Sequence, residues 1–370
     1  MQIKKRTQGK AFAKAIKLGP KSIIKLLKDK GLAGRSGGGF PTGMKWEMVF
    51  NEKEKEKYVI CNADEGEPGT FKDKLILTKN PETVIEGILI ASYVIGAKKA
   101  FIYLRGEYEY LVSKINKAIK EVKNKTKSKT EIEIALGQGA YVCGEETAII
   151  NSIEGHRGQP EQKPPFPTTD GLFGKPTIIN NVETLANASL AILYDDWDPN
   201  LRLYCLSGNV TKPGVYEIPL GTPLCKLIEM GRPKNKIKAI FLACFGGSLP
   251  YCEMPLTPEE VKKKGCIHGT GAIVAVDENH SIVDVCTNIA KFFEFESCGK
   301  CTPCREGTMR ILALLQNISM GKATKKDLNT LQELAEVIKE TSFCGLGKTS
   351  TLHVLSALKF FRKEFEEKCR

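Results

Sequence analysis

Residues 34–46 read Gly34-Arg35-Ser36-Gly37-Gly38-Gly39-Phe40-Pro41-Thr42-Gly43-Met44-Lys45-Trp46, with five glycines, a proline, two cations and two aromatic rings. Consecutive glycines cost backbone entropy, so a stable fold keeps them where the chain needs unusual dihedral angles or close contact with another group. A flat ligand with a phosphate needs this combination, because backbone N–H groups can face the anion while a ring and a lysine lie beside it. A flexible linker is the alternative, but a linker has no use for Phe40 and Trp46. The stretch therefore predicts a ligand-binding loop.

This glycine loop follows neither of the two standard phosphate-binding patterns. It lacks the Walker spacing, and the dinucleotide fingerprint that Gly34, Ser36 and Gly39 approximate has no middle glycine. The loop instead resembles the Gly-Arg-Gly-Gly-Ala-Gly-Phe-Pro-Thr-Gly-x-Lys-Trp segment of the NADH-oxidising flavoprotein subunits of respiratory complex I. Relatives of those subunits occur in NAD-reducing hydrogenases and NAD-dependent formate dehydrogenases. The chain departs from the segment at Ser36 and Gly38, so the resemblance implies that the Ser36 side chain points away from a flavin.

An acidic loop follows the apolar run Tyr58–Cys61, which is typical of a buried strand. It reads Asn62-Ala63-Asp64-Glu65-Gly66-Glu67-Pro68-Gly69-Thr70. A strand that runs into a polar loop is the usual ligand position in an open α/β sheet, although three carboxylates in four residues also suit a solvated loop. The loop matches the family motif Cys-Asn-x-Asp-Glu-x-Glu-Pro-Gly, and the resemblance implies flavin contacts here with Glu67 near the nicotinamide.

Two later stretches carry candidate binding residues. In Gly137–Thr147, glycines precede an apolar helical run, so backbone amides gather at a helix start. Carboxylates repel phosphates, and the resemblance makes Glu145 and Glu146 acceptors for ribose hydroxyls or a carboxamide. Lys163–Pro167 is a stiff polyproline segment, which alone suits a linker or an SH3-type ligand. The resemblance places its lysine and phenylalanine against the dinucleotide, with the ring on adenine.

The cysteine motif Cys298-Gly-Lys-Cys301-Thr-Pro-Cys304 is the most specific pattern in the chain. Zinc usually draws its four ligands from two separated pairs, whereas three thiolates at i, i+3 and i+6 suit three corners of a cubane. The fourth ligand must come from elsewhere, and Cys344 between Phe343 and Gly345 is the candidate that the family arrangement also implies. Zinc, with His353 as a replacement ligand, is the alternative.

The order of strand-like and helix-like runs predicts the fold. Before residue 198 we expect strands at Tyr58–Cys61, Lys99–Leu104 and Glu131–Ala135, and a helix at Val84–Tyr93. Lys114–Lys129 suits a helix or a surface excursion, and Asn180–Thr184 opens a further helix with an Asn as its N-cap. Short strands follow at Leu201–Ser207, Gly214–Pro219 and Ala239–Cys244, and leucines at helical spacing follow from Leu328. With the resemblance, we predict an α/β fold: a Rossmann-like FMN- and NADH-binding domain with a parallel sheet (1–198), a small ubiquitin-like, SLBB-type α+β domain (199–280) and a helical bundle with the cluster (281–370). We interpret the middle domain as structural, because catalytic residue types are sparse in it.

Composition and charge exclude several classes of protein. Hydrophobic residues make up 42% and charged residues 26% of the 370, which is ordinary globular composition. The longest apolar run, Val84–Ala97, is too short and too charged for a transmembrane span. Residues 1–30 carry most of the net charge of +12, but they have too few aromatic rings for a nucleic-acid surface, so we expect a solvated helix face or a docking surface for an acidic partner. Thirteen cysteines without a secretory signal predict a reducing, cytoplasmic location. The resemblance implies attachment to the inner face of the cell membrane through a larger complex.

The resemblance implies a site for each cofactor. The implied FMN ligands are Gly34, Arg35, Ser36, Lys45, Asn62, Asp64, Glu65, Tyr141, Gly144, Glu145, Glu146, Asn180, Asn181 and Thr184. The implied NADH contacts are Phe40, Glu67, Lys163 and Phe166, and the implied [4Fe-4S] ligands are Cys298, Cys301, Cys304 and Cys344. No residue is expected to act as a general acid or base; Glu67 and Glu146 would position the nicotinamide.

The function that follows is an NADH dehydrogenase (NADH-quinone oxidoreductase) flavoprotein subunit. NADH would pass a hydride to FMN, and single electrons would reach the [4Fe-4S] cluster. From there they would pass to partner subunits, a thioredoxin-like [2Fe-2S] subunit and a further iron–sulfur subunit. The alternatives are the flavin subunit of a soluble NAD-linked hydrogenase or formate dehydrogenase, including an electron-bifurcating one, and a zinc-stabilised basic binding module without redox activity. The final electron acceptor and the physiological direction are open at this point.

Overall fold

The computed structural model describes residues 2–370, which form two compact units. The first unit holds the residues up to Gly66 together with Phe71–Leu201. The second unit holds Glu67–Thr70 together with Arg202–Arg370, so four residues of the acidic loop belong to it. The division into three domains at residues 198 and 280 stays a prediction.

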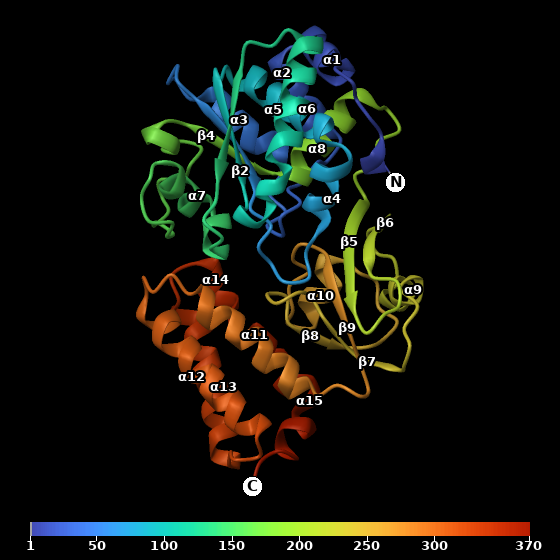
Figure 1. Cartoon of the computed structure of the whole chain (residues 1–370), viewed down its shortest axis with the longest axis vertical. Coiled ribbons are helices and arrows are strands. Elements are labelled where there is room, and N and C mark those ends of the chain that lie inside the picture. Colours follow the sequence, from blue (N-terminus) through green and yellow to red (C-terminus); the bar gives the residue numbers. More distant parts are fainter. Residues whose placement is uncertain (1) are drawn as a thin grey trace. The chain divides into compact units, whose positions relative to one another are not determined.

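The first unit is built on a four-stranded parallel sheet, as the α/β prediction requires (Figure 1). Its strands are β1 Tyr58–Ala63, β2 Lys99–Leu104, β3 Glu131–Leu136 and β4 Thr177–Asn181, in the order β3-β2-β1-β4. The chain moves outward from β1 to β2 and β3 and then returns to the other side of β1 as β4. The carboxyl ends of β1 and β4 therefore form the switch point of the sheet, where open α/β sheets bind their ligands.

Helices cover this sheet. In Figure 1, α5, α6 and α8 lie to the right of its strands and α7 to the left. The α-helices are α1 Lys10–Leu18, α2 Pro20–Asp29, α3 Thr42–Asn51, α4 Lys72–Lys79, α5 Pro81–Ile95, α6 Val112–Thr126, α7 Glu146–Ile153 and α8 Val182–Leu193. Short 3-10 helices are η1 Gln2–Lys4, η2 Gly106–Leu111, η3 Tyr141–Gly144 and η4 Leu172–Gly174. Strand β4 was not predicted, because its five residues run directly into the cap of α8.

Helix α5 contains most of the apolar run that is too short for a membrane span, and the helix is buried on nearly every side. Gly87 lets α8 approach closely, since a Cβ at this position would lie 2.1 Å from the Leu185 carbonyl oxygen. The one carboxylate in the middle of α5, Glu86, is fully buried and accepts hydrogen bonds from the Thr7 hydroxyl (2.7 Å) and the Phe12 amide (3.1 Å). Glu86 thereby accepts from a backbone N–H group in the first turn of α1, a helix that has no side-chain cap of its own.

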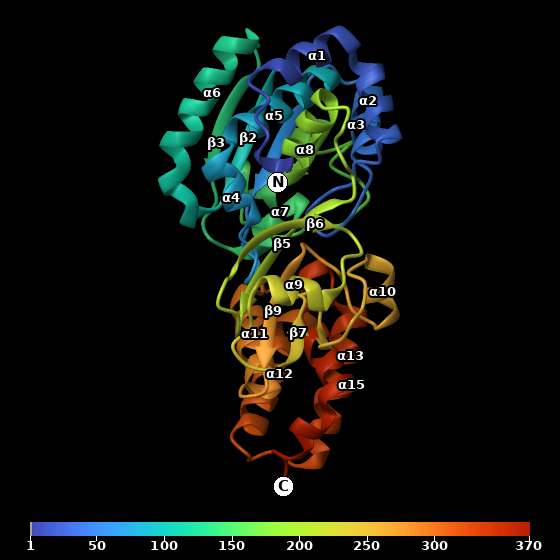
Figure 2. The ribbon, with the colours of Figure 1, turned by 90° about the vertical axis from the view of Figure 1, so that its right-hand side faces the viewer.

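The second unit begins with a five-stranded mixed sheet. Its strands are β5 Leu201–Gly208, β6 Gly214–Pro219, β7 Ile237–Phe241, β8 Ser248–Pro250 and β9 Ala272–Asp277, in the order β6-β5-β9-β7-β8. Helices α9 Leu224–Met230 and α10 Pro258–Lys263 accompany them (Figure 2). Strand β7 ends three residues earlier than predicted, and the chain takes a positive φ of 49° at Ala243.

The bundle in the same unit consists of α11 Ile282–Glu296, α12 Thr302–Ser319, α13 Lys325–Thr341, α14 Gly345–Thr349 and α15 Leu352–Glu366. The predicted helical spacing is confirmed, because Leu328, Leu331 and Ile338 are buried in the bundle core. That core also contains Phe241 of β7 and Val276 of β9, so the sheet and the bundle share one hydrophobic cluster. Within residues 2–370, no helix is long and apolar enough to cross a membrane.

Candidate functional site

The glycine loop ends at the switch point of the first unit. The Gly34 amide donates to the Phe40 carbonyl (2.9 Å), which closes the loop, and Gly37 (φ 101°) and Gly39 (φ 62°) take left-handed dihedrals that favour glycine. The next turn begins α3, whose Trp46 indole is fully buried and donates to Asn180 Oδ1 at the end of β4 (2.8 Å). The loop is therefore fastened to β4 by a buried aromatic side chain.

Arg35 is buried, and it contacts protein groups. Its backbone amide donates to the Thr184 hydroxyl (2.9 Å), and its guanidinium donates to the Pro199 carbonyl (3.0 Å). Ser36 is exposed at the tip of the loop, and no protein atom lies within 4 Å of the position of a Cβ at Gly38 or Gly39. The tip of the loop thus faces open space, whereas its base is anchored to α8.

A chain of alternating charges links two residues that the sequence assigned to different ligands. Lys45 of α3 donates to Glu146 and to the Ile179 carbonyl (3.1 Å), and Lys163 donates to Glu145 (2.7 Å) and Glu146 (3.4 Å). Burial alone would raise the pKa of Glu146, but Lys45 and Lys163 outweigh burial and hold it below its ordinary value. Burial would lower the pKa of Lys163, and Glu145 and Glu146 raise it instead. The charged forms of Glu146 and Lys163 are therefore favoured in this chain of contacts.

The acidic loop is held against the turn that contains Glu145. Asn62 donates to the Gly144 carbonyl (2.9 Å) and accepts from the Asp64 amide (3.1 Å). Tyr141 lies against Gly66, where a Cβ would come within 2.8 Å of the ring. Glu145 caps α7 by accepting from the Thr147 (2.8 Å) and Ala148 (3.1 Å) amides. The end of β1 and the start of α7 thus form one hydrogen-bonded surface.

Glu65 points into the protein and caps α4. Its carboxylate accepts from the Asp73 amide (2.8 Å), the Lys74 amide (2.9 Å) and the Tyr108 hydroxyl (3.1 Å). Burial raises its pKa to about 7, and the neighbouring charge of Asp73 adds to the rise. These contacts give Glu65 a structural role, and its predicted role as an FMN ligand stays a prediction.

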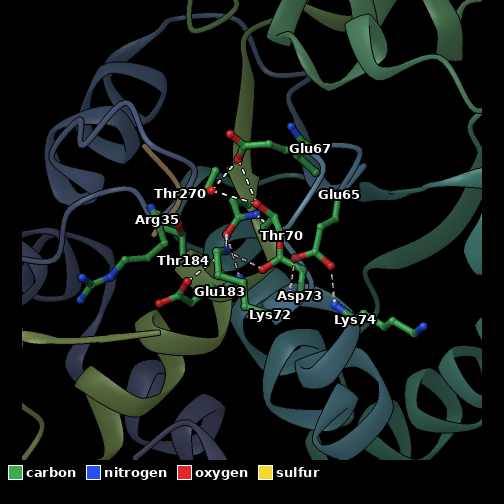
Figure 3. A network of polar contacts seen from close by, with 12 residues as sticks. Arg35, Glu65, Glu67, Thr70, Lys72, Asp73, Lys74, Glu183, Thr184 and Thr270 are labelled. Atoms are coloured by element: carbon green, nitrogen blue, oxygen red, sulfur yellow. Dashed lines mark hydrogen bonds and ion pairs between the residues drawn. The ribbon is translucent and has the colours of Figure 1, made fainter. Parts of the chain in front are cut away.

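Beside Glu65 lies a buried ionic network that the sequence did not predict (Figure 3). The Lys72 side chain is 1% exposed and pairs with Asp73 (2.8 Å) and Glu183 (3.0 Å). Asn181 caps α8 by accepting from the Glu183 amide (3.0 Å), and it donates to Asp73 Oδ2 (2.6 Å). One cation therefore serves two carboxylates and an amide, next to the predicted FMN ligands at the end of β4.

The candidate NADH contacts lie in two settings. Phe40 and Phe166 are exposed, at 43% and 55%, as large rings on the surface of the first unit. Glu67 belongs to the second unit and is 6% exposed. Its Oε2 accepts from the hydroxyls of Thr70 (3.0 Å) and Thr270, and the two hydroxyls are 3.0 Å apart (Figure 3). Thr270 was not foreseen, because nothing near it in the sequence marks it as a partner of the acidic loop.

The four candidate cluster cysteines come together from two segments of the bundle. Cys301 stands at the start of α12, Cys304 is buried in its first turn, and Cys344 stands at the start of α14. Lys300 lies over the Phe343 ring (5.2 Å), and a Cβ at Gly347 would come within 3.3 Å of the Cys304 Cβ. Burial raises the pKa of Cys304 to about 11, opposed by a hydrogen bond from Ser297 and reinforced by Cys298, Cys301 and Cys344. The four thiols therefore lie near one another.

Within residues 2–370, no group of three or more His, Cys, Asp or Glu side chains is placed to hold one metal ion. The amides of Leu346 and Gly347 bind the Cys344 sulfur, as the glycines beside it suggested. His353, the candidate ligand under the zinc alternative, is fully buried and stacks on Phe293 (ring centroids 5.8 Å, 12° between planes).

Comparison with known proteins assigns both parts of the chain. Residues 27–189 match the Nuo51 FMN-binding domain, 203–232 match the SLBB domain, and 284–368 match the NADH-ubiquinone oxidoreductase-F iron-sulfur binding region. The chain is 41% identical to the F subunit of NADH-quinone oxidoreductase in Streptomyces coelicolor, over 99% of this chain and 87% of that protein. It is 38% identical to the HndC subunit of the NADP-reducing hydrogenase in Solidesulfovibrio fructosivorans, over 96% of this chain and 77% of that protein.

A solved structure gives the same result. A chain of the air-oxidised NAD+-reducing [NiFe]-hydrogenase superposes with a TM-score of 0.91 at 37% identity; the match covers 100% of this chain and 66% of the hydrogenase chain. The present chain thus spans about two thirds of that hydrogenase chain. The FMN-binding domain and the iron–sulfur region fall where the glycine loop and the cysteine motif predicted them. The chain therefore belongs to the family of NADH-quinone oxidoreductase F subunits, the NADH dehydrogenase subunits of complex I with FMN and [4Fe-4S] domains, which are related to subunits of NAD-reducing hydrogenases.

Proposed function

We propose that this chain binds FMN at the switch point of its parallel sheet, oxidises NADH there and delivers electrons through a [4Fe-4S] cluster on Cys298, Cys301, Cys304 and Cys344. The observation that carries the proposal is the convergence of separate motifs in the first unit. Trp46 binds Asn180, Lys45 binds Glu146, and Asn62 binds the Gly144 carbonyl. Residues far apart in the sequence thereby form one polar surface at the end of β1 and β4.

The donor set at this surface fits FMN. A phosphate needs a cation and backbone amides, which Lys45 and the open glycine loop supply. A ribityl chain and a flavin ring edge need amide and carboxylate groups, which Asn62, Asp64 and Asn180 supply at the ends of two adjacent strands. When bound, FMN accepts two electrons as a hydride and releases them one at a time.

The chain's own residues then orient NADH. Phe40 and Phe166 are exposed rings able to stack on the dinucleotide, and Lys163 supplies a charge beside Glu145. We assign to Glu67 and Glu146 the role of positioning the nicotinamide carboxamide. Hydride transfer requires a near-attack geometry and no proton from the protein, so the residues act by orientation.

The cysteines fit a multi-iron cluster. Burial, and then the neighbouring cysteines Cys298 and Cys301, raise the pKa of Cys304 and Cys344, and backbone amides reach the Cys344 sulfur. Hydrogen bonds to the sulfurs tune the potential of such a cluster.

We also propose that the chain works within a larger complex at the inner face of the cell membrane, beside a thioredoxin-like [2Fe-2S] subunit and a further iron–sulfur subunit. The second candidate is a subunit of a soluble NAD-linked hydrogenase, which the likeness to the NAD+-reducing [NiFe]-hydrogenase favours. Identifying the proteins that copurify with the tagged chain from its native source separates the two assemblies.

The direct test of the site is a visible absorption spectrum of the protein after anaerobic purification, before and after addition of NADH. Flavin and iron–sulfur bands that bleach with NADH support the proposal. A colourless protein that contains zinc contradicts it and favours a zinc-stabilised binding module.

A further inference from the structure

The acidic loop is shared between the two compact units, and its second half is held by residues from a part of the chain that the sequence marked as structural. Glu67–Thr70 group with Arg202–Arg370, although Gly66 and Phe71 on either side group with the first unit. Gly69 takes a φ of 89°, and a Cβ there would lie 3.2 Å from Val274 Cγ2 of β9. The loop therefore packs closely against the strand that follows Thr270.

Thr270 makes the decisive contact. Its hydroxyl donates to Glu67 Oε2, and the Thr70 hydroxyl donates to the same oxygen from 3.0 Å. Glu67 is 6% exposed, so these bonds form in a largely dehydrated place where charge-assisted hydrogen bonds are strong. The thiol of Cys244 is a further neighbour, since burial and then the Glu67 charge raise its pKa well above the ordinary value. Two hydroxyls on one oxygen leave the carboxylate little freedom to rotate.

The segment that presents Thr270 is held by contacts with β5. Gly269 (φ 63°) and Gly271 (φ 86°) flank it in left-handed conformations, and a Cβ on Gly271 would come within 2.8 Å of the Leu203 carbonyl. The Gly271 carbonyl accepts from the Cys205 amide of β5 (3.0 Å). Two residues before Thr270, the His268 ring lies 3.0 Å from the Tyr204 hydroxyl. Strand β5 thus fixes both sides of Thr270 before any ligand is bound.

We propose that Thr270 is a positioning residue for NADH oxidation, which acts by holding the Glu67 carboxylate in one orientation. The proposal rests on the role given to Glu67 in the proposed function. It gives Thr270 a role beyond the structural one predicted for residues 199–280. Preorganised groups bind a ligand more tightly because less ordering remains to be done on binding.

The test compares Thr270→Val, which keeps the shape and removes the hydroxyl, with Thr270→Ser, which keeps the hydroxyl. Because Thr270 acts indirectly and Thr70 still donates to the same oxygen, Thr270→Val should raise KM for NADH only about three- to tenfold, with a smaller change in kcat. Thr270→Ser should restore most of the affinity.

ADP-ribose lacks the nicotinamide, so its inhibition constant should be the same in all three proteins. FMN content and the unfolding temperature should stay near wild type. Thr222→Val, which removes a hydroxyl that donates to the Pro219 carbonyl (2.7 Å), is the matched control.

A double-mutant cycle with Glu67→Gln separates this inference from the proposed function. If Thr270 acts through Glu67, Thr270→Val should change KM less in the Glu67→Gln background than in the wild type. If Glu67→Gln raises KM and Thr270→Val does not, the role of Glu67 stands and that of Thr270 is wrong. If neither changes KM while FMN stays bound, the assignment of Glu67 itself is wrong. Equal losses in Thr270→Val and Thr270→Ser, or weaker ADP-ribose binding, would show a structural role and overturn the inference.

Discussion

Lys72 is the residue on which the buried ionic network depends. It lies between Asp73 and Glu183, and although burial would lower its pKa, these two carboxylates raise it. Burial raises the pKa of Glu183, and the charges of Lys72 and Arg35 only partly offset this rise. The charge of Lys72 is thus required by its neighbours.

We expect Lys72→Met to lower the free energy of unfolding by about 3–5 kcal/mol, because it leaves two buried carboxylates without their cation. Urea unfolding of the purified variant measures this loss. Lys74→Met is the control: its side chain is exposed, so the change should stay within about 0.5 kcal/mol. A loss as small in Lys72→Met as in Lys74→Met would mean that the network does not stabilise the fold.

His353 makes the stability depend on pH. Burial lowers its pKa to about 3 from an ordinary value of 6.5. Between pH 6.5 and pH 3, the unfolded chain therefore binds a proton at His353 that the folded protein does not bind. Stability should therefore fall as pH falls from 6.5 toward 3, by up to about 1.4 kcal/mol per pH unit from this group. His353→Phe, which can keep the stack on Phe293, should flatten that part of the profile. Urea midpoints at pH 7, 6 and 5 provide the check, and parallel profiles for the two proteins would refute the assignment.

Substitutions at Lys45 and Lys163 test whether Lys45 binds FMN and Lys163 binds NADH, as we assign them. Both bind Glu146, so the structure brings together two residues that we assign to different ligands. Lys45→Met should weaken FMN retention about ten- to hundredfold, the worth of a charge-assisted contact of about 1.5–3 kcal/mol. Lys163→Met should instead raise the NADH requirement while FMN stays bound. FMN content and NADH titrations of both variants decide the matter, and full flavin with weak NADH binding in Lys45→Met would reverse the assignment.

Elements pack closely where glycine allows it, and α5 against α8 is the clearest case. Gly87→Ala would gain up to about 1 kcal/mol of helix propensity. Its Cβ, however, would lie 2.1 Å from the Leu185 carbonyl oxygen, and overpacking of this kind costs about 1–3 kcal/mol or more. We therefore expect a lower unfolding temperature in Gly87→Ala. Gly38→Ala, where the space is open, should leave it unchanged; equal temperatures for both variants would contradict the packing argument.

The elements that the sequence predicted and those it missed differ in the strength of their local signal. Lys99–Leu104 was predicted with its observed bounds, and an Asn cap was predicted for the helix that opens at residues 180–184, because an apolar run and an N-cap are local patterns. The structure places that cap at Asn181. Strand β8 has three residues, too few for any periodicity, and β4 has five before its helix begins. Strand β9, with its apolar run Ala272–Val276, carried a signal that a wider search for such runs would have found.

At the scale of the whole molecule, the flavin and cluster regions belong to units with separate cores. The FMN-binding match covers 27–189 and the iron–sulfur match covers 284–368. We therefore expect Cys301→Ala to lose iron and keep FMN, with NADH still reducing the flavin once but no electrons reaching a partner. Iron and FMN analyses check this, with Cys225→Ala as a control that should keep both. Wild-type iron in Cys301→Ala, and in the same change at Cys298, Cys304 and Cys344, would refute the ligand set.

The sequence by itself determined the family, the α/β class and the cofactor regions, because each rests on motifs whose residues are neighbours in the chain. Only the tertiary structure decided which of these residues meet. Lys45 and Glu146 are 101 positions apart, Lys72 and Asn181 109, and Glu67 and Thr270 203. Such pairs produce no local periodicity or spacing in the sequence, because each polar side chain, considered alone, looks like a solvent-exposed side chain. They form because the parallel sheet brings separate strand ends to one edge, and because the second unit takes Glu67–Thr70 from the acidic loop.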